Sequence, residues 1–290
     1  MTRATNRTVR QALQEAQQRF TLGNIAAPGL DARVLLRQVL SFTAAELVLH
    51  LDDPLSQESA TAFADLVERR LAGEPVAYLT GRREFFGLEF RVSADVLVPR
   101  PETELLVQRA IDMLPKGAGV VDVGTGSGAI AVAVARCRAD VRIVAVDRSL
   151  PACRVALSNV YDHEVTHQVT VVCADLLAGV TAPFDAVLAN LPYLRRDELS
   201  ALATDVQREP RQALDGGVDG LEQYRRLLSD LAERQPRPTL VLCEIAPRQR
   251  DAMHAMVAAA LPDHRVLVLS DLAGRARLAE ARLLDDAGGA

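Results

Sequence analysis

The chain of 290 residues lacks a long apolar run, has few cysteines and contains a single lysine, Lys116. No segment approaches the roughly 18 uninterrupted apolar residues of a membrane-spanning helix, and the polar start at residues 2–18 has no secretory apolar core. No low-complexity block or internal repeat is visible. We therefore expect a cytoplasmic protein with no membrane association.

The cysteines and histidines do not form a metal-binding pattern. The four cysteines are widely spaced within expected helices and strands, and the five histidines show no ligand spacing. We predict that the cysteines are reduced core residues and expect no metal; they are Cys137, Cys153, Cys173 and Cys243.

The charge balance is mildly acidic. A net charge of −5 is unfavourable for non-specific nucleic-acid binding, because phosphate neutralisation needs a basic surface. We therefore expect no direct nucleic-acid partner. The length allows one large domain and a smaller one, and the hydrophobic share of 49% supplies enough core for both without disulfides.

The first part of the chain, residues 1–75, is predicted to be a small bundle of four or five helices. Apolar residues recur there at spacings of three and four, as in Val9, Leu13, Ala16 and Phe20. Helix starts are expected near three polar residues, Asp31, Thr43 and Ser56. Because no catalytic cluster is visible, we assign the bundle to recognition of a macromolecular substrate, with a purely structural role as the alternative.

The second part is predicted to be an α/β domain. Residues 76–104 form a linker with a hairpin around Gly87, and from 105 to 290 strands and helices alternate, which is typical of a doubly wound, mostly parallel sheet covered on both faces. The expected strands are 120–123, 141–146, 169–173, 184–189, 239–245, 265–269 and 275–283.

A glycine-rich turn follows the first of these strands. It consists of Gly124, Thr125, Gly126, Ser127 and Gly128 and leads into an apolar helix. Such a turn brings backbone N–H groups and the positive end of a helix close to a ligand. Since Ala129 stands where a dinucleotide fingerprint tolerates alanine, the turn also fits an NAD-binding loop.

Acidic residues follow the next two strands. Asp147 ends strand 141–146, about 20 residues after the turn, where a carboxylate accepts the hydroxyls of a ribose. Asp175 follows strand 169–173 and is placed, with Leu176, to meet the edge of an adenine ring. A helix cap at Asp147 and a turn at Asp175 are the structural alternatives.

The most informative stretch is Asn190, Leu191, Pro192 and Tyr193, directly after the apolar run 184–189. In an open α/β sheet, ligands bind beyond the carboxyl ends of the strands. The Asn190 side-chain oxygen and the Leu191 carbonyl can accept both hydrogens of a planar –NH2 group while the Tyr193 ring covers its face. The alternatives are a turn role for Asn190 and core packing for Tyr193.

These motifs resemble class I S-adenosylmethionine-dependent methyltransferases, and more closely the family of peptide chain release factor N5-glutamine methyltransferases. The similarity extends to blocks at residues 74–81, 84–88, 97–104 and 209–221. It implies a seven-stranded sheet with an antiparallel insertion near its edge, and S-adenosyl-L-methionine as the cofactor. The implied cofactor-binding residues are Gly124, Thr125, Gly126, Ser127, Gly128, Asp147, Asp175, Leu176 and Asn190.

The resemblance also implies a function. The substrate is the glutamine of the Gly-Gly-Gln loop of release factors, and the catalytic residues are Asn190, Leu191, Pro192 and Tyr193. Thr103 and Glu102 line the cofactor pocket, with a plain helix start as the alternative, and Asp122 either contacts the amino group of the donor or is structural. We expect a monomer.

The chain departs from the family pattern at two positions. Leu191 replaces the first proline of the usual Asn-Pro-Pro-Tyr, and Ala246 replaces the usual glycine after Glu244 and Ile245. An Asn-Leu-Pro-Tyr loop is similar to that of adenine-N6 dimethyltransferases acting on ribosomal RNA, so an adenine-N6 methyltransferase is the alternative function. The flanking blocks favour glutamine. A non-enzymatic or NAD-binding module is a third hypothesis, which leaves the Asn190 loop unexplained.

Overall fold

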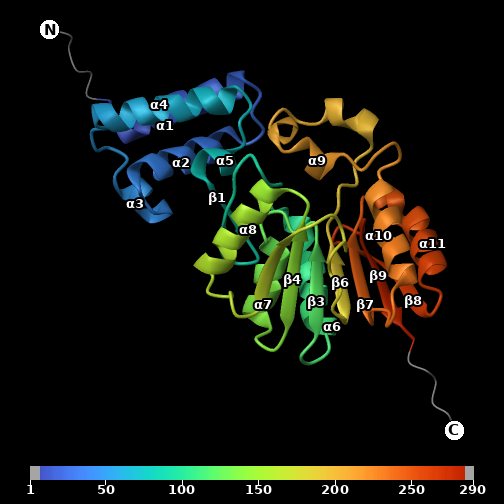
Figure 1. Ribbon diagram of the computed structural model, residues 1–290. Helices are drawn as coiled ribbons and strands as arrows, with labels where there is room; N and C mark the ends of the chain where they lie inside the picture. Colours follow the sequence, from blue (N-terminus) through green and yellow to red (C-terminus); the bar gives the residue numbers. More distant parts are fainter. Residues whose placement is uncertain (1–6, 285–290) are drawn as a thin grey trace. The chain divides into compact units, whose positions relative to one another are not determined.

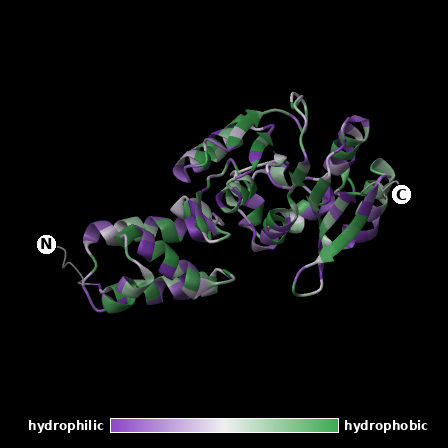
Figure 2. Cartoon of the chain, turned by 90° about the horizontal axis from the view of Figure 1, so that it is seen from below, coloured by the Kyte–Doolittle hydropathy of each residue, from purple (hydrophilic) through white to green (hydrophobic). Residues whose placement is uncertain are grey.

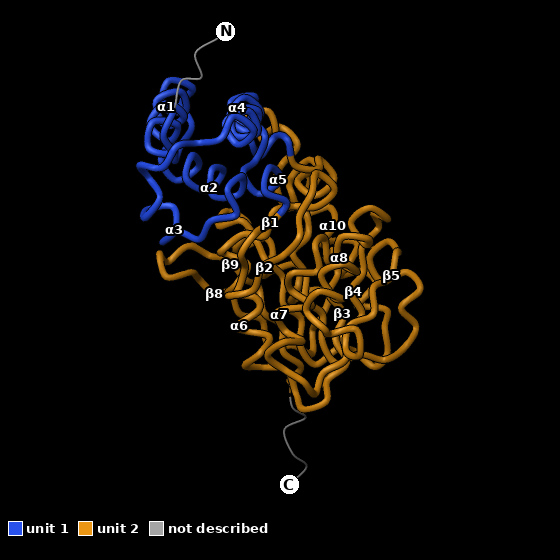
Figure 3. The backbone as a smooth tube through the Cα atoms, turned by 90° about the vertical axis from the view of Figure 1, so that its left-hand side faces the viewer, with its two compact units in different colours: residues 1–81, 203–208 blue, residues 82–202, 209–290 orange. Residues whose placement is uncertain are grey.

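A computed structural model describes residues 7–284, and they divide into two compact units. One unit comprises the residues up to 81 together with 203–208, and the other comprises 82–202 and the residues from 209 onward (Figure 3). Each unit has a hydrophobic core of its own residues.

The first unit is helical, as predicted. Its helices are α1 (Val9–Leu22), α2 (Pro28–Leu40), α3 (Ala44–Leu49), α4 (Gln57–Leu71) and α5 (Val76–Thr80). Hydrophilic and hydrophobic residues alternate around them (Figure 2), and one face of each packs into a core that includes Phe20, Leu35, Leu36 and Phe63. Thr43 and Ser56 are N-caps whose side chains accept backbone N–H groups of the first turn, which confirms the two predicted starts.

The third helix start, expected near Asp31, is also confirmed. Helix α2 begins at Pro28, because proline is favoured in the first turn, and Asp31 lies inside that turn. Its buried carboxylate accepts Arg70 Nε at 2.8 Å, and Arg70 Nη2 also contacts Asp205 Oδ2 at 3.2 Å. The ion pairs join the segment 203–208 to the helices of this unit.

The second unit begins with a hairpin, β1 (Arg82–Phe85) and β2 (Leu88–Arg91). Phe86 and Gly87 form its two-residue turn with φ values of 52° and 70°. Positive φ at both positions is the geometry of a type I′ turn, which matches the right-handed twist of the strands. The predicted turn at Gly87 is therefore confirmed.

A seven-stranded sheet follows in the order β5-β4-β3-β6-β7-β9-β8 (Figure 1). All strands are parallel except β9, which lies antiparallel between β7 and β8. The predicted α/β class and antiparallel insertion are confirmed, with strand ends within a few residues. The strands are β3 (Gly119–Val123), β4 (Arg142–Asp147), β5 (Val169–Cys173), β6 (Ala186–Ala189), β7 (Leu240–Glu244), β8 (His264–Ser270) and β9 (Ala276–Leu283).

Helices cover both faces of this sheet. Alternate residues of the strands point to opposite sides, and because the residues on both sides are apolar, each face has to be buried. Val120 belongs to a core shared with α6 (Glu104–Met113), α7 (Ala129–Cys137) and α8 (Leu150–Asp162), whereas Val121 packs with α10 (Glu222–Glu233) and α11 (Arg250–Ala260). Short helices complete this unit: η1 (Pro101–Thr103), η2 (Arg196–Ala201), α9 (Arg211–Leu214) and η4 (Pro247–Gln249). The short helix η3 (Val206–Arg208) belongs to the first unit.

The four cysteines are all free, but only two are core residues. Cys137 ends α7 and Cys173 ends β5 at the edge of the sheet, so both are exposed and the prediction of four core cysteines is wrong for them. Within residues 7–284, no group of His, Cys, Asp and Glu side chains has the arrangement of a metal site. No helix of that range is long and apolar enough to span a bilayer.

Candidate active site

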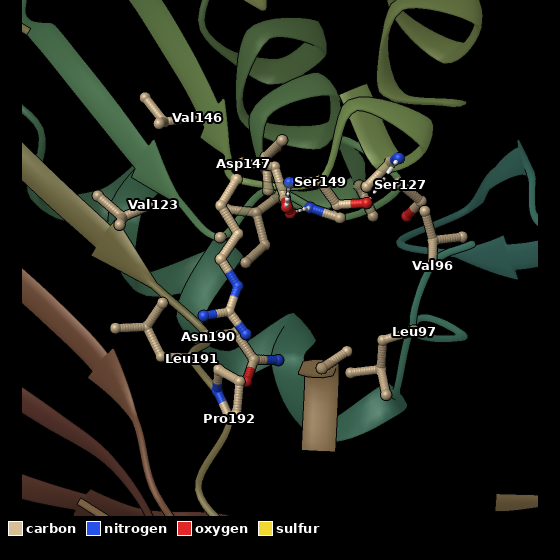
Figure 4. A pocket seen from close by; sticks show the side chains of 18 of the residues that line it. Val96, Leu97, Val123, Ser127, Val146, Asp147, Ser149, Asn190, Leu191 and Pro192 are labelled. Carbon is tan, nitrogen blue, oxygen red and sulfur yellow. Dashed lines mark hydrogen bonds between the residues drawn. The ribbon is translucent and has the colours of Figure 1, made fainter. Parts of the chain in front are cut away.

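A pocket opens at the carboxyl ends of β3, β4 and β6, where the sequence places its ligand motifs. Figure 4 shows Asp147, Ser149, Asn190 and Leu191 on one side of this pocket, with Val96 and Leu97 across from them. Most predicted site residues contribute to its lining: Gly124, Thr125, Gly126, Ser127, Asp147, Asp175, Leu176, Asn190, Leu191 and Pro192. Gly128 and Tyr193 are outside that lining in the described structure.

The glycine turn has a conformation that requires glycine. Gly124 and Gly128 have φ values of 77° and 81°, which a side chain rarely adopts. A Cβ at Gly128 would lie 3.3 Å from Ala156 Cα, so this residue also allows close packing of α8 against the start of α7. The N–H groups of Gly124 and Thr125 both donate to Val146 O, at 2.8 and 2.9 Å, which fixes the turn to β4.

Asp147 links the glycine turn to the next helix. Its Oδ2 accepts the N–H of Gly126 and its Oδ1 accepts the N–H of Ser149, both at 2.9 Å. Ser149, rather than Asp147, is the N-cap of α8, since its hydroxyl accepts the Ala152 N–H. The carboxylate is thus oriented by two backbone donors at the rim of the pocket, where it retains acceptor capacity for a ligand.

Two further carboxylates differ in burial: Asp175 is half exposed and Asp122 is fully buried. Asp175 pairs with Arg226 Nη2 at 2.5 Å and is half exposed. Asp122 is fully buried and does not line the pocket. It accepts the Thr125 hydroxyl at 2.6 Å, and burial raises the pKa of its carboxyl to about 7. Asp122 therefore supports the glycine turn from beneath, which favours its structural role.

The Asn190 amide has a defined orientation. Its Nδ2 donates to Thr103 Oγ1 at 3.0 Å, so Oδ1 is the acceptor that remains for a ligand. Thr103 is almost fully buried at the end of η1 and also lines the pocket, as the resemblance implied, whereas Glu102 does not. The helix start formed by Pro101–Thr103 thereby positions an amide on another element, the end of β6.

Leu191 is accommodated by a hydrogen bond that proline cannot make. Its N–H donates to Tyr224 Oη at 3.2 Å, and the Tyr224 hydroxyl donates to the main-chain carbonyl of Glu244. The Leu191 side chain is buried against the glycine turn, where a Cβ at Gly124 would lie 2.9 Å from Leu191 Cδ2. Tyr224 thus satisfies the additional donor that leucine introduces at this position.

The Tyr193 side chain points to Glu244, whose main-chain carbonyl accepts the Tyr224 hydroxyl. Its hydroxyl donates to Glu244 Oε1 at 3.3 Å, and burial raises the pKa of the phenol above its usual range. Gln249 Nε2 donates to the Tyr193 carbonyl at 3.0 Å. The Tyr193 ring packs on the core between the sheet and α10, so in this structure it anchors the loop.

The opposite wall depends on a residue that sequence reasoning did not single out. Glu209, almost fully buried, accepts the N–H of Val98 at 3.0 Å and pairs with Arg100 Nη2 at 2.5 Å. These contacts hold the pocket-lining residues Pro99 and Arg100. The only signal in the sequence was the Glu209-Pro210-Arg211 block, which was used for the resemblance and carried no local prediction. The lining also includes Gln212 and Ala213, which belong to the block used for the resemblance, and Arg148, Ser149 and Gln223; none of the five was predicted to line the pocket.

Comparison with known proteins finds two matching family models and a similar fold. Residues 11–81 match the model of the PrmC N-terminal domain, and residues 101–217 match the methyltransferase small domain. The structure is also similar to the catalytic domain of hMettl16 in complex with MAT2A 3'UTR hairpin 1. There the TM-score is 0.58 and the identity 14%, covering 82% of this chain and 85% of that chain, which supports the fold alone.

Curated relatives match over nearly the whole chain. The release factor glutamine methyltransferase of Moorella thermoacetica is 39% identical, covering 93% of this chain and 96% of its own length. That of Cereibacter sphaeroides is 40% identical, covering 94% and 97%. Identity of this level over almost the full length of both proteins confirms the resemblance, and the chain belongs to the family of release factor glutamine methyltransferases.

Proposed function

We propose that this chain transfers a methyl group from S-adenosyl-L-methionine to the side-chain amide nitrogen of the glutamine in the Gly-Gly-Gln loop of peptide chain release factors. The substrate class is supported by the relatives, which are named release factor glutamine methyltransferases. The structural observation that carries the proposal is the Asn190 amide: its nitrogen is engaged by Thr103, and its oxygen remains as an acceptor in the pocket that contains the glycine turn.

The residues at the glycine turn fit S-adenosylmethionine. Gly124 and Gly126 adopt left-handed φ values and have no side chains, so a ligand can approach their backbone at the pocket. Asp147 is held there by two N–H donors. In this proposal, the turn holds the methionine part, Asp147 binds the ribose hydroxyls, and Asp175 and Leu176 bind the adenine edge. The bound cofactor supplies an electrophilic methyl group on a sulfonium.

The loop after β6 would act on the substrate amide. A carboxamide nitrogen is a weak nucleophile, so the largest contribution is to hold it in line with the methyl group. Asn190 Oδ1 and the Leu191 carbonyl accept its two hydrogens and stabilise the positive charge that develops during attack. Pro192 restricts the loop through its fixed φ.

We also propose a role for the helices of residues 1–75 in recognising the release factor, with 76–104 as linker and 105–290 as the catalytic domain. Large apolar side chains of the helical unit are exposed, among them Leu22, Val48 and Leu49, and protein interfaces commonly bury such side chains. The proposal includes a monomeric enzyme that acts in the cytoplasm and needs no direct contact with nucleic acid.

The test uses purified protein, labelled S-adenosylmethionine, and either a release factor or its variant with alanine in place of the Gly-Gly-Gln glutamine. We expect incorporation into the first and none into the second. Equal labelling of both would overturn the glutamine assignment. Labelling of an adenine-containing RNA or DNA instead would favour the adenine-N6 alternative.

A further inference from the structure

The molecule contains a buried carboxyl group that the proposed reaction does not use directly. Glu244 ends β7, is 2% exposed, and its Oε2 has no hydrogen-bond partner within residues 7–284. Ala189 pairs with Cys243 in the parallel register of β6 and β7, so Asn190 and Glu244 are the next residues on neighbouring strands. Burying a carboxyl group without full pairing is costly, so its presence beneath the Asn190 loop needs an explanation.

Glu244 lies beside three of the residues that anchor that loop, Thr103, Tyr193 and Tyr224. The Thr103 hydroxyl, which accepts Asn190 Nδ2, interacts with the Glu244 carboxylate and favours its ionised form. The Tyr193 hydroxyl donates to Oε1 at 3.3 Å. The main-chain carbonyl accepts the Tyr224 hydroxyl, which in turn accepts the Leu191 N–H.

We propose that Glu244 is a positioning residue that sets the orientation of the Asn190 amide through the Thr103 hydroxyl, an inference that rests on the proposed function of the same pocket. The ionised carboxylate accepts the Thr103 proton, so the Thr103 oxygen can only accept from Asn190. The Asn190 nitrogen then points to Thr103 and its oxygen faces the substrate. A neutral donor at position 244 allows Thr103 to donate to Asn190 Oδ1, which turns the NH2 group toward the substrate and removes the acceptor.

The surroundings make this arrangement sensitive to pH. Burial raises the pKa of the Glu244 carboxyl to about 7, and Glu102 adds to this rise, while Arg277 and the hydroxyls of Thr103 and Tyr193 oppose it. The hydroxyl of Tyr224, which is also buried, donates to the main-chain carbonyl of Glu244 and not to its carboxyl group. A carboxyl of pKa about 7 is ionised above that pH, so the productive Asn190 orientation is gained as the pH rises through about 7.

Three variants test the proposal. Thr103→Val removes the hydroxyl at nearly constant volume, Thr103→Ser keeps it, and Glu244→Gln keeps the size of the side chain but not its charge. We expect kcat for release-factor methylation to fall by about 10- to 100-fold in Thr103→Val and Glu244→Gln, while Thr103→Ser stays within about threefold of the parent enzyme. The Kd for S-adenosylmethionine, measured by calorimetry, should remain within about threefold in Glu244→Gln, because Glu244 does not line the pocket.

A second readout is independent of turnover. The ¹⁵N-labelled side-chain amide of Asn190 is followed by NMR between pH 5.5 and 8.5 in the parent protein and in Glu244→Gln. We expect a shift with a midpoint near 7 that is absent from Glu244→Gln and a matching step in kcat. An Asn190 amide signal that does not shift in the parent, a shift that persists in Glu244→Gln, or equal losses in Thr103→Ser and Thr103→Val would overturn the inference.

The two proposals fail in different ways. If the parent protein binds S-adenosylmethionine but does not methylate the release factor, the proposed function fails, and the NMR titration still decides the role of Glu244. If the parent methylates normally and the Thr103→Val and Glu244→Gln variants do so equally well, only the role of Glu244 is excluded.

Discussion

The two sides of the pocket are held together in different ways. The glycine side, residues 124–128 with Asp147, is fixed by backbone N–H groups that donate to Val146 and to the Asp147 carboxylate. The amide side, residues 190–193, is fixed by side chains from distant parts of the sequence, Thr103, Tyr224 and Glu244. The glycine side can be recognised in the sequence because its backbone conformation requires glycines close together in a turn. The contacts that fix the amide side join residues far apart in the sequence and leave no such pattern.

The largest effect is expected on the amide side. Asn190→Ala removes an acceptor for the substrate amide and should lower kcat by about 100- to 1,000-fold, as loss of one preorganised hydrogen-bonding group does in other active sites. The measurement is single-turnover methylation of a release factor at saturating S-adenosylmethionine. The control is the cofactor Kd by calorimetry, which should change little; a kcat within about tenfold of the parent would mean that Asn190 is not the orienting group.

On the glycine side, a comparable change should affect binding instead of turnover. Asp147→Asn removes a carboxylate that accepts two N–H groups and should weaken S-adenosylmethionine binding by about 10- to 100-fold, the range for a lost charged hydrogen bond. Calorimetric titration measures it. Asp175→Asn is the matched control, because its exposed ion pair with Arg226 should contribute less. A larger effect at Asp175 than at Asp147 would reverse the assigned roles.

Gly128→Ala tests whether the glycine side is fixed by its backbone. The φ of 81° and a Cβ only 3.3 Å from Ala156 Cα should together lower the free energy of unfolding by about 2 to 3 kcal/mol. Gly179→Ala is the control, since Gly179 has a φ of 82° and open space, so it should cost only about 1 to 2 kcal/mol. Urea denaturation of both variants gives the difference, and equal costs would show that the contact with α8 is unimportant.

The smallest effect concerns the leucine that replaces the usual proline. Tyr224→Phe leaves the Leu191 N–H without its partner and should lower the free energy of unfolding by about 1 to 3 kcal/mol. In a Leu191→Pro background that N–H is absent, so the same change should cost about 1 kcal/mol less. A double-mutant cycle by urea denaturation measures the coupling. Strictly additive effects would contradict a role for Tyr224 in accommodating leucine.

Sequence reasoning identified much of the fold and the glycine side. The strands were apparent because buried parallel strands are near-continuous apolar runs, as in Ala186–Ala189, and the positive φ of Gly124 and Gly128 explains why glycine stands there. Asn190 was apparent because a polar residue ended such a run.

What could not be predicted depends on contacts between elements. Asp31 lies in the first turn of α2, close to the predicted helix start, but its buried ion pair with Arg70, a residue 39 positions later in the chain, was not predicted. Glu209 holds the segment at Val98 and Arg100 across more than a hundred residues. Periodicity and turn preferences describe neighbours in sequence, and they contain no information about such pairs.

The most direct test is a crystal structure with S-adenosylhomocysteine and a peptide that carries Gly-Gly-Gln. The glutamine side-chain nitrogen should lie within about 3.2 Å of both Asn190 Oδ1 and the Leu191 carbonyl oxygen, between them and the cofactor at the glycine turn. A glutamine side chain bound elsewhere, or an Asn190 that presents its nitrogen to the peptide, would contradict the proposed reaction geometry.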